Sequence, residues 1–193
     1  TGDYIESNQI IWNDDIDRLK QRFGDQIQYV APSVSSSCDV KVGRRQGKFY
    51  ITGVAEDYDK SKAMDLLYGR MINEADVKSG RPGVVIEKRA AVELFNTENA
   101  VGKILTLTLD GEQRDLTVLG VYDVETTIFS QMSSGNYNCY VPYPLLQANS
   151  GDGVTMLEVY VDPDENVSEM ANKIPSYLSR IKDQKEGFYT YES

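Results

Sequence analysis

The feature that most constrains the fold of this 193-residue sequence is a β-hairpin pattern in its second half. Residues 104–109 and 116–121 are two strand-like runs, and Asp110-Gly111 follows the first of them. Asp-Gly favours the tight turns whose left-handed backbone matches the twist of paired strands. Because the side chains of a strand alternate between its two faces, Leu105, Leu107 and Leu109 should share one face. A shift of one residue in the strand pairing would move all three to the opposite face. The hairpin therefore predicts a sheet with one buried face.

The rest of the chain alternates between strand-like and helix-like stretches without a strict strand–helix–strand series. This favours a mixed α/β or α+β fold. We expect strands at 27–31, 38–42, 49–54, 84–86, 139–141, 157–161 and 188–191, and helices at 14–23, 57–69, 89–95 and 167–182. The first of these strands runs into Pro32. Pro175 is expected to interrupt or kink the last helix, whose apolar stripe is predicted as Met170, Ile174, Tyr177 and Ile181.

Composition excludes several classes of function. The absence of histidine removes the commonest general base and the commonest neutral metal ligand, so Ser-His-Asp and Cys-His catalysis cannot be assembled. Cys38 and Cys139 lie too far apart in sequence for a paired-cysteine zinc motif. The 30 acidic and 20 basic residues give a formal net charge of -10, which repels nucleic acid. We expect no catalytic residue, no metal, no cofactor and no nucleic-acid partner in this chain.

No apolar run approaches the roughly 18 residues that a membrane-spanning helix needs. We therefore expect the chain itself to be soluble. Thr1 does not begin a charged-then-apolar leader, and the ends resemble cut points within a longer protein. A membrane-bound parent protein is compatible with this sequence.

A series of short motifs occurs in order along the chain. These motifs are Ile51-Thr52-Gly53-Val54, Gly69-Arg70, Asp76, Val84-Val85-Ile86, Leu94-Phe95, Val101-Gly102-Lys103, Val118-Leu119-Gly120-Val121 and Tyr140-Val141-Pro142. Together they resemble the extracytoplasmic core domain of MacB-like ABC transporter permeases, the wider group that includes FtsX-like and lipoprotein-releasing permeases. The resemblance extends to the first helix and covers about residues 12–161. Each motif alone is weak, and their order and spacing give the match its strength.

The resemblance implies a bacterial domain inserted between two membrane helices, on the extracytoplasmic side of the cell membrane. Its fold would be two-lobed, with a porter-like α/β lobe formed by both chain ends and an inserted β-rich lobe. We expect residues 1–63 and 149–193 in the first lobe and 64–148 in the second. ATP would be hydrolysed only on a separate ATPase domain or subunit. The implied partners are that ATPase, a second permease copy and a peptide or lipoprotein substrate.

Arg70 has two interpretations. It is suited to bidentate recognition of a carboxylate on a ligand, or it pairs with an acid such as Asp76 to hold its own loop. The second is favoured. Gly102 and Gly120 are expected to serve turns or close backbone packing, because no Gly-rich loop precedes a helix with phosphate-binding spacing.

Two acidic clusters bear on metal binding. Asp162, Asp164, Glu165 and Asn166 place oxygen ligands close together, as calcium requires. The spacing lacks the glycine and the distal glutamate of a calcium-binding loop, so a turn and an acidic helix start are favoured instead. The same applies to the acidic first turn of the helix at 14–23.

Cys38 and Cys139 are one possible disulfide, which an extracytoplasmic location would permit. They fall in different predicted lobes, and a disulfide requires Cα atoms within about 7 Å. We therefore favour two free thiols.

Residues 123–138 form a polar, turn-rich segment that we expect to be an exposed excursion. Phe129 and Met132 are its apolar side chains, and they are the candidate partner contacts. The alternative, which is favoured, is that they cover the neighbouring lobe.

The leading functional hypothesis is a non-enzymatic domain that couples cytoplasmic ATP hydrolysis to export or mechanical work outside the membrane. The alternative is an extracellular sensor that binds a peptide or antibiotic and signals to a regulator. A secreted hydrolase that uses carboxylates alone is a third, disfavoured hypothesis, because no carboxylate pair stands out. The isolated chain is expected to be monomeric or weakly dimeric.

Overall fold

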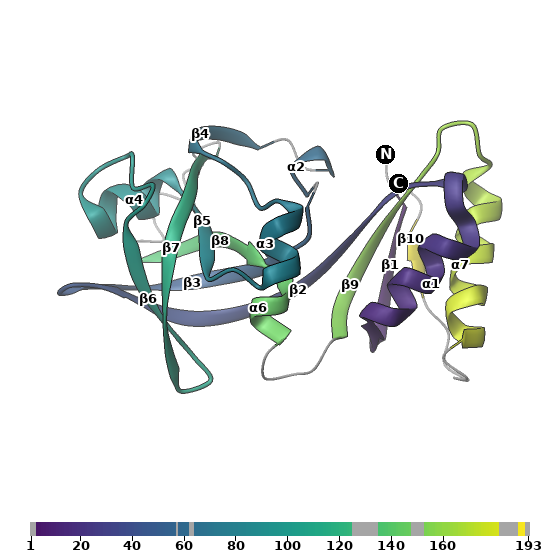
Figure 1. Ribbon diagram of the computed structural model, residues 1–193, viewed down its shortest axis with the longest axis horizontal. Coiled ribbons are helices and arrows are strands. Elements are labelled where there is room, and N and C mark those ends of the chain that lie inside the picture. The colour runs from purple at the N-terminus through teal and green to yellow at the C-terminus, as the bar shows by residue number, and fades with distance from the viewer. Residues whose placement is uncertain are drawn as a thin grey trace. The chain divides into compact units, whose positions relative to one another are not determined.

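The computed structural model describes residues 3–56, 58–61, 64–124, 135–147, 153–181 and 189–191. Backbone contacts divide the chain into unit 1, formed by Thr1–Val34 and Gln147–Ser193, and unit 2, formed by Ser35–Leu146. The elements of both units are shown in Figure 1.

Unit 1 is a four-stranded antiparallel sheet with two helices. Its elements are β1 (Asp3–Trp12), α1 (Asn13–Phe23), the 3-10 turn η1 (Gly24–Gln26), the first part of β2 (Ile27–Val42), β9 (Gly153–Val161), α7 (Val167–Ile181) and β10 (Tyr189–Tyr191). The strand order is β10-β1-β9-β2. Because β9 is antiparallel to both β1 and β2, the strands β1 and β2 are parallel and α1 connects them. The strands β9 and β10 are connected by α7 in the same way, so two strand–helix–strand crossovers interleave, as in a ferredoxin-like sheet.

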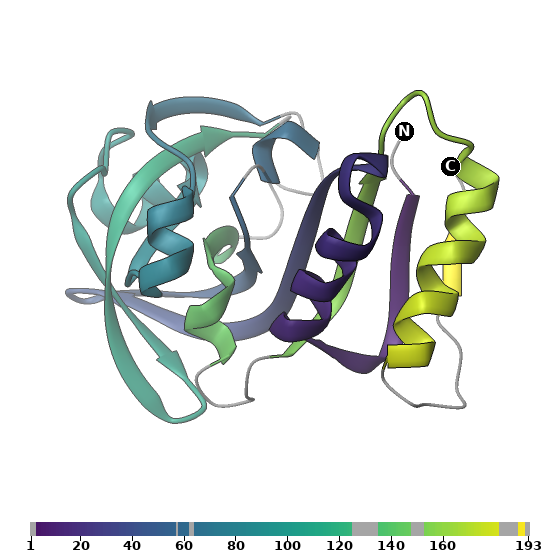
Figure 2. The same ribbon diagram turned by 45° about the vertical axis from the view of Figure 1, so that its right-hand side comes forward.

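The two helices cover one face of this sheet (Figure 2). In α1 the apolar spacing of three and four residues buries Ile16, Leu19 and Phe23. In α7 the buried residues are Met170, Ile174 and Leu178. The predicted stripe was therefore wrong at its C-terminal end, where Tyr177 and Ile181 lie half-buried at the edge of the interface and Leu178 points inward.

The interruption predicted at Pro175 was wrong, and the strand expected at 27–31 is longer than predicted. The helix α7 continues through Pro175, and buried residues on both sides of the proline pack against the unit 1 core. The strand β2 continues through Pro32, which is paired in register with Leu157 of β9. Because β2 is the edge strand of the unit 1 sheet, a missing N–H donor is tolerated there.

Unit 2 contains a closed ring of strands. Its elements are the rest of β2, β3 (Arg45–Val54), α2 (Tyr58–Ser61), β4 (Asp65–Gly69), α3 (Glu74–Ser79), β5 (Gly83–Glu87), α4 (Lys88–Phe95), β6 (Ile104–Leu109), β7 (Glu112–Asp123), β8 (Asn136–Pro142) and α6 (Tyr143–Gln147), whose last residue belongs to unit 1. The hydrogen-bonded order is β2-β3-β8-β5-β7, and β6 pairs with both β7 and β2. The six strands thus return to their starting point, and β4 is added outside the ring by pairing with β7.

The predicted hairpin is confirmed as β6 and β7. Leu109 pairs with Glu112, and Asp110 and Gly111 between them have φ angles of 51° and 81°, as the tight turn requires. The leucines at 105, 107 and 109 are buried, so the predicted face is correct. The run Val84–Ile86, expected to be a strand, lies within β5, all of whose residues are buried.

Two segments between residues 57 and 82 differ from the prediction. Leu66 and Leu67, assigned to a helix, lie in strand β4 and are 40% and 37% exposed. Pairing with β7 takes precedence over their helical spacing, because it satisfies the backbone of β4. The segment after β4, where no helix was predicted, contains the short helix α3.

The boundary between the units also differs from the division inferred from resemblance. That division placed residues 1–63 and 149–193 in one lobe and 64–148 in the other. By backbone contacts, residues 35–63 belong with unit 2, because the second part of β2 pairs there with β3 and β6. A single 16-residue strand supplies both units, so no turn or linker in the sequence indicates where one ends.

Candidate functional site

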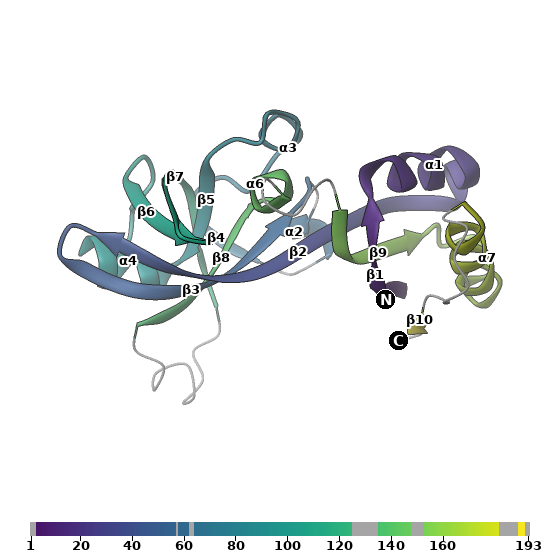
Figure 3. The same ribbon diagram turned by 90° about the horizontal axis from the view of Figure 1, so that it is seen from below.

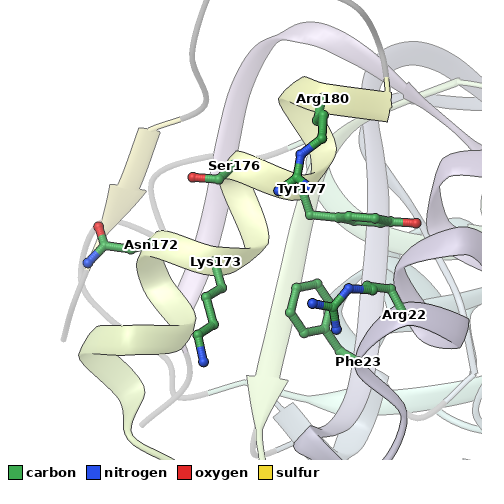
Figure 4. Close-up of a pocket in the computed structure, with 7 residues that line it drawn as sticks. All are labelled: Arg22, Phe23, Asn172, Lys173, Ser176, Tyr177 and Arg180. Carbon is green, nitrogen blue, oxygen red and sulfur yellow. The ribbon is translucent and has the colours of Figure 1, made fainter.

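A groove of about 220 Å³ opens between α1 and α7 in unit 1 (Figure 4). It is lined by the last two residues of α1 and by one side of α7; the lining residues are Arg22, Phe23, Asn172, Lys173, Ser176, Tyr177 and Arg180. The helical spacing of 173, 176, 177 and 180 places these α7 residues on one side of the helix. We call this feature the α1–α7 groove.

The floor of the groove is aromatic. The rings of Phe23 and Tyr177 meet edge to face, with centroids 5.7 Å apart and an interplanar angle of 87°. The guanidinium carbon of Arg22 lies 5.0 Å from the centre of the Phe23 ring, within the range of a cation–π contact. Figure 4 shows the Phe23 ring and the Arg22 side chain on the α1 side, facing Tyr177 on α7. Because Phe23 is only 4% exposed, this ring is held rigidly by the core.

The rim of the groove is cationic. Arg22, Lys173 and Arg180 are exposed, and within the described residues neither arginine forms an ion pair. Lys173 has one acidic neighbour, with its Nζ 3.8 Å from Glu169 Oε2, and both side chains are more than half exposed. Such an exposed i,i+4 pair contributes little. Three cations therefore surround one aromatic floor on a chain whose net charge is -10.

The sequence-predicted partner contacts, Phe129 and Met132, lie outside the described residues. Their role stays a prediction.

The pairing of Arg70 with Asp76 is confirmed. Asp76, fully buried, accepts hydrogen bonds from Arg70 Nη1 at 2.6 Å and from the Asn73 backbone N–H at 3.0 Å, and Arg81 Nε lies 2.7 Å from its other oxygen. Burial alone would raise the pKa of Asp76, but these hydrogen bonds and the two guanidinium charges outweigh it and hold the pKa below its usual value. The cluster caps α3 and closes its own loop, so its function is structural.

Gly102 and Gly120 also have structural functions. Gly102 has a φ of 85° in the turn before β6, and its N–H donates to the Val118 carbonyl at 2.9 Å. A Cβ at Gly120 would lie 2.4 Å from the Arg70 carbonyl oxygen, so only glycine permits the two backbones to approach this closely. Both observations agree with the predicted turn and packing roles.

The acidic cluster at 162–166 forms a turn followed by a helix cap. Asp162 Oδ1 accepts from the Asp164 N–H at 2.9 Å, and Asn166 Oδ1 accepts from the Glu169 N–H at 3.1 Å at the start of α7. Among the described residues no group of three or more acidic, cysteine or histidine side chains is arranged to hold a metal ion.

Cys38 and Cys139 are both buried free thiols in unit 2. Burial raises the pKa of Cys38 to about 11 and the pKa of Cys139 well above its usual value, with a smaller contribution from Cys38. Because the thiolate is the reactive form, neither side chain is activated as a nucleophile.

Sequence reasoning missed the α1–α7 groove because its residues come from two helices more than a hundred positions apart. The available signals were the basic last turn of α1 and the spacing of Lys173 and Arg180 on α7. Neither signal is specific, since basic residues near helix C-termini commonly offset the helix dipole.

In the parts of the chain that the structure describes, no helix combines the length and apolar character needed to cross a membrane.

Comparison with known proteins identifies relatives over nearly the whole chain. The family described as the MacB-like periplasmic core domain matches residues 2–177. The macrolide export ATP-binding/permease protein MacB of Aggregatibacter actinomycetemcomitans is 27% identical over 165 residues, which are 84% of this chain and 25% of that protein. The chain thus spans about a quarter of the length of the curated relatives that it matches.

Solved structures share the fold. The extracellular domain of the noncanonic ABC-type transporter YknZ from Gram-positive bacteria has a TM-score of 0.77 at 20% identity, covering 98% of this chain and 97% of that one. The periplasmic region of MacB from Actinobacillus actinomycetemcomitans has a TM-score of 0.76 at 23% identity, covering 98% and 87%. These likenesses confirm the predicted mixed α/β fold.

Proposed function

Because this chain belongs to the MacB-like periplasmic core domain family, we propose that it is the extracytoplasmic domain of an ABC transporter permease and that it transmits movement of the membrane helices to a substrate outside the membrane. The family is a transporter-domain family, not a catalytic one. In this proposal ATP is hydrolysed by a separate cytoplasmic domain or subunit, a second permease copy completes the transporter, and this domain needs no cofactor.

One observation supports the transmission of movement most directly. Tyr4 near the start of β1 pairs with Tyr191 at the end of β10, so the first and last described strands have their outer ends side by side (Figure 3). Segments attached there would leave unit 1 at the same edge. We call these two attached segments the tethers. When both tethers move in one direction, they displace the sheet without sliding β1 along β10. Unit 1 is thus suited to follow the membrane helices as one body.

The sensor hypothesis requires a pocket for a small ligand. Pockets that enclose drug-sized molecules usually measure about 300–1,000 Å³. The α1–α7 groove, at about 220 Å³, is smaller than this range. Calorimetric titration of the 193-residue chain with peptides, lipopeptides and cell-wall fragments tests the sensor hypothesis, and saturable binding that does not require Arg22 and Arg180 would favour it.

The proposal that this domain transmits movement is tested in the complete transporter by making the C-terminal tether flexible. A flexible Gly-Ser insertion placed directly after Ser193 should leave ATP hydrolysis unchanged and abolish export, because movement would be absorbed by the linker. The control carries the same insertion between Gly43 and Arg44, an exposed turn in unit 2 far from either tether in sequence. Unchanged export with the tether insertion would contradict the proposal, as would equal loss in the control.

A further inference from the structure

The α1–α7 groove combines charges and surfaces that match one kind of ligand. An exposed arginine or lysine is ordinary on a protein surface, but here Arg22, Lys173 and Arg180 converge on the same hollow. Guanidinium groups form paired hydrogen bonds with carboxylates, and the two arginines have no ion-pair partner within the described residues. The two arginines thus offer cationic donors whose acceptors are not supplied by the described residues of the neighbouring helices, whereas Lys173 has the weak exposed pair with Glu169.

The aromatic floor adds a requirement for apolar surface. Tyr177, which is half-buried, presents ring surface beside the cations with the buried Phe23 ring next to it, and Ser176 and Asn172 provide hydroxyl and amide groups at the α7 margin. A bare anion would leave the exposed part of the Tyr177 ring uncovered. A peptide with an acidic side chain next to an apolar one would satisfy both parts of the groove.

Other anionic partners fit less well. Inorganic phosphate could engage the cations, but it has no apolar part to cover the Tyr177 ring. An anionic membrane would meet the whole helical layer, and the first turn of α1 carries Asp14 and Asp15, which repel it. The volume of about 220 Å³ suits one or two side chains of a peptide.

We propose that the α1–α7 groove binds an acidic segment of a partner protein, in which a Glu or Asp side chain engages Arg22, Lys173 and Arg180 while an adjacent apolar side chain packs on Tyr177. The groove lies wholly within unit 1, so the interaction is a property of this chain. It extends the transport proposal by giving the chemistry of one partner, but the binding itself does not depend on transport.

The test is fluorescence anisotropy of the 193-residue chain with a labelled peptide, Glu-Glu-Leu-Glu-Glu. The same peptide with Gln in place of Glu removes the charge, and a version with Gly in place of Leu removes the apolar contact. We expect saturable binding of the first peptide and at least about tenfold weaker binding of both others, since charge-assisted bonds and the buried apolar contact act together. Raising the salt concentration should also weaken the binding.

Variants of the chain identify the site. Arg22→Gln combined with Arg180→Gln should weaken binding of Glu-Glu-Leu-Glu-Glu about tenfold or more. The matched control, Arg18→Gln combined with Arg44→Gln, changes net charge equally at exposed positions outside the groove and should keep most of the binding. Lys173→Gln serves as a second variant, because its exposed side chain has no place in the core, and it should weaken binding about threefold or more.

The proposal would be overturned by equal binding of the Gln peptide, or by equal loss in the two double variants. It would also be overturned if phosphatidylglycerol vesicles bound the chain through these residues while the peptide did not, which would assign the groove to a membrane surface. Saturation by inorganic phosphate in competition with every peptide would reduce the groove to a simple anion site. None of these outcomes bears on the tether experiment, which is read in the complete transporter.

Discussion

At the scale of single residues, the interactions that hold this chain together differ in kind from those at the candidate binding site. Asp76 is fully buried, and every charge near it is matched by a hydrogen bond or an ion pair. Arg22 and Arg180 in the α1–α7 groove are exposed and form no ion pair among the described residues. A buried and matched charge stabilises one conformation, whereas an exposed and unmatched one is available to a partner.

Replacing Asp76 with Asn should therefore destabilise unit 2. The change removes the negative charge that Arg70 and Arg81 contact, and hydrogen bonds to charged groups contribute about 1.5–3 kcal/mol each. We expect the free energy of unfolding in urea to fall by about 2 kcal/mol. Glu74→Gln, on the same helix, removes an exposed carboxylate paired with Lys78 and should cost less than about 0.5 kcal/mol. A similar loss in both variants would contradict a special role for Asp76.

The same carboxyl should make stability depend on pH. Because the pKa of Asp76 is lowered in the folded protein, its ionised form contributes stability above the unfolded carboxyl pKa of about 4. That contribution is lost as the pH falls through the lower folded pKa. The difference in unfolding free energy between the native chain and Asp76→Asn should thus be constant near neutrality and shrink below about pH 4. If the difference in unfolding free energy stayed constant below about pH 4, the charge of Asp76 would not be the source of that difference.

At the scale of elements, local sequence patterns predicted secondary structure well where the turn residues and the spacing of the apolar residues indicated the same structure. The hairpin of β6 and β7 is one such case, because the Asp-Gly turn and the leucine alternation indicate the same register. The helix α7 is a different case. Its amphipathic pattern predicted a helix and Pro175 predicted an interruption, and the packing of Met170, Ile174 and Leu178 supports the uninterrupted helix.

Pro175 should consequently cost stability in α7. It lacks the N–H that would donate to the Ala171 carbonyl, and its ring crowds the preceding turn. We expect Pro175→Ala to raise the unfolding free energy by about 1–3 kcal/mol, measured by thermal and urea unfolding. Ser179→Ala, one turn further along, should change it by less than about 0.5 kcal/mol. Lower stability of Pro175→Ala would indicate that the proline ring makes packing contacts that outweigh the missing hydrogen bond.

At the scale of the whole molecule, the chain is organised by insertion. The four strands of unit 1 come from both ends of the sequence, and unit 2 occupies the interval between β2 and β9. The ring of six strands in unit 2 leaves β4 as an added edge strand. Within the described residues, the sheet of each unit is formed without any strand from a second copy of the chain.

The isolated 193-residue chain should accordingly be a monomer. In the proposed transporter, the membrane and ATPase parts hold the two permease copies together, and this domain adds little. Sedimentation velocity at low micromolar concentration should give the mass of one chain, independent of concentration across that range. A tight dimer under these conditions would mean that the extracytoplasmic domain itself drives assembly.

Much of the fold could be predicted from particular residues, and the candidate site could not. Leu105, Leu107 and Leu109 determine a strand face without reference to the rest of the chain. Leu66 and Leu67 have helical spacing, but β7 supplies hydrogen-bond partners that favour a strand, and no local pattern indicates that pairing. The strand β1 was missed entirely, because its partners β9 and β10 are about 150 residues away. The groove depends on the same distant pairing, which brings α7 beside α1.

By itself, the amino-acid sequence determined the mixed α/β class, the β6–β7 register, the Arg70–Asp76 pair and, through ordered short motifs, the family. These follow from local backbone preferences, from apolar periodicity and from residue order, all of which can be read along the chain. Only the tertiary structure decided that β2 continues through Pro32 into both units, that α7 continues through Pro175, and that three cations line one groove with Phe23 and Tyr177. The physical reason is that each of these depends on long-range packing, whose free energy exceeds the local preferences of the residues involved.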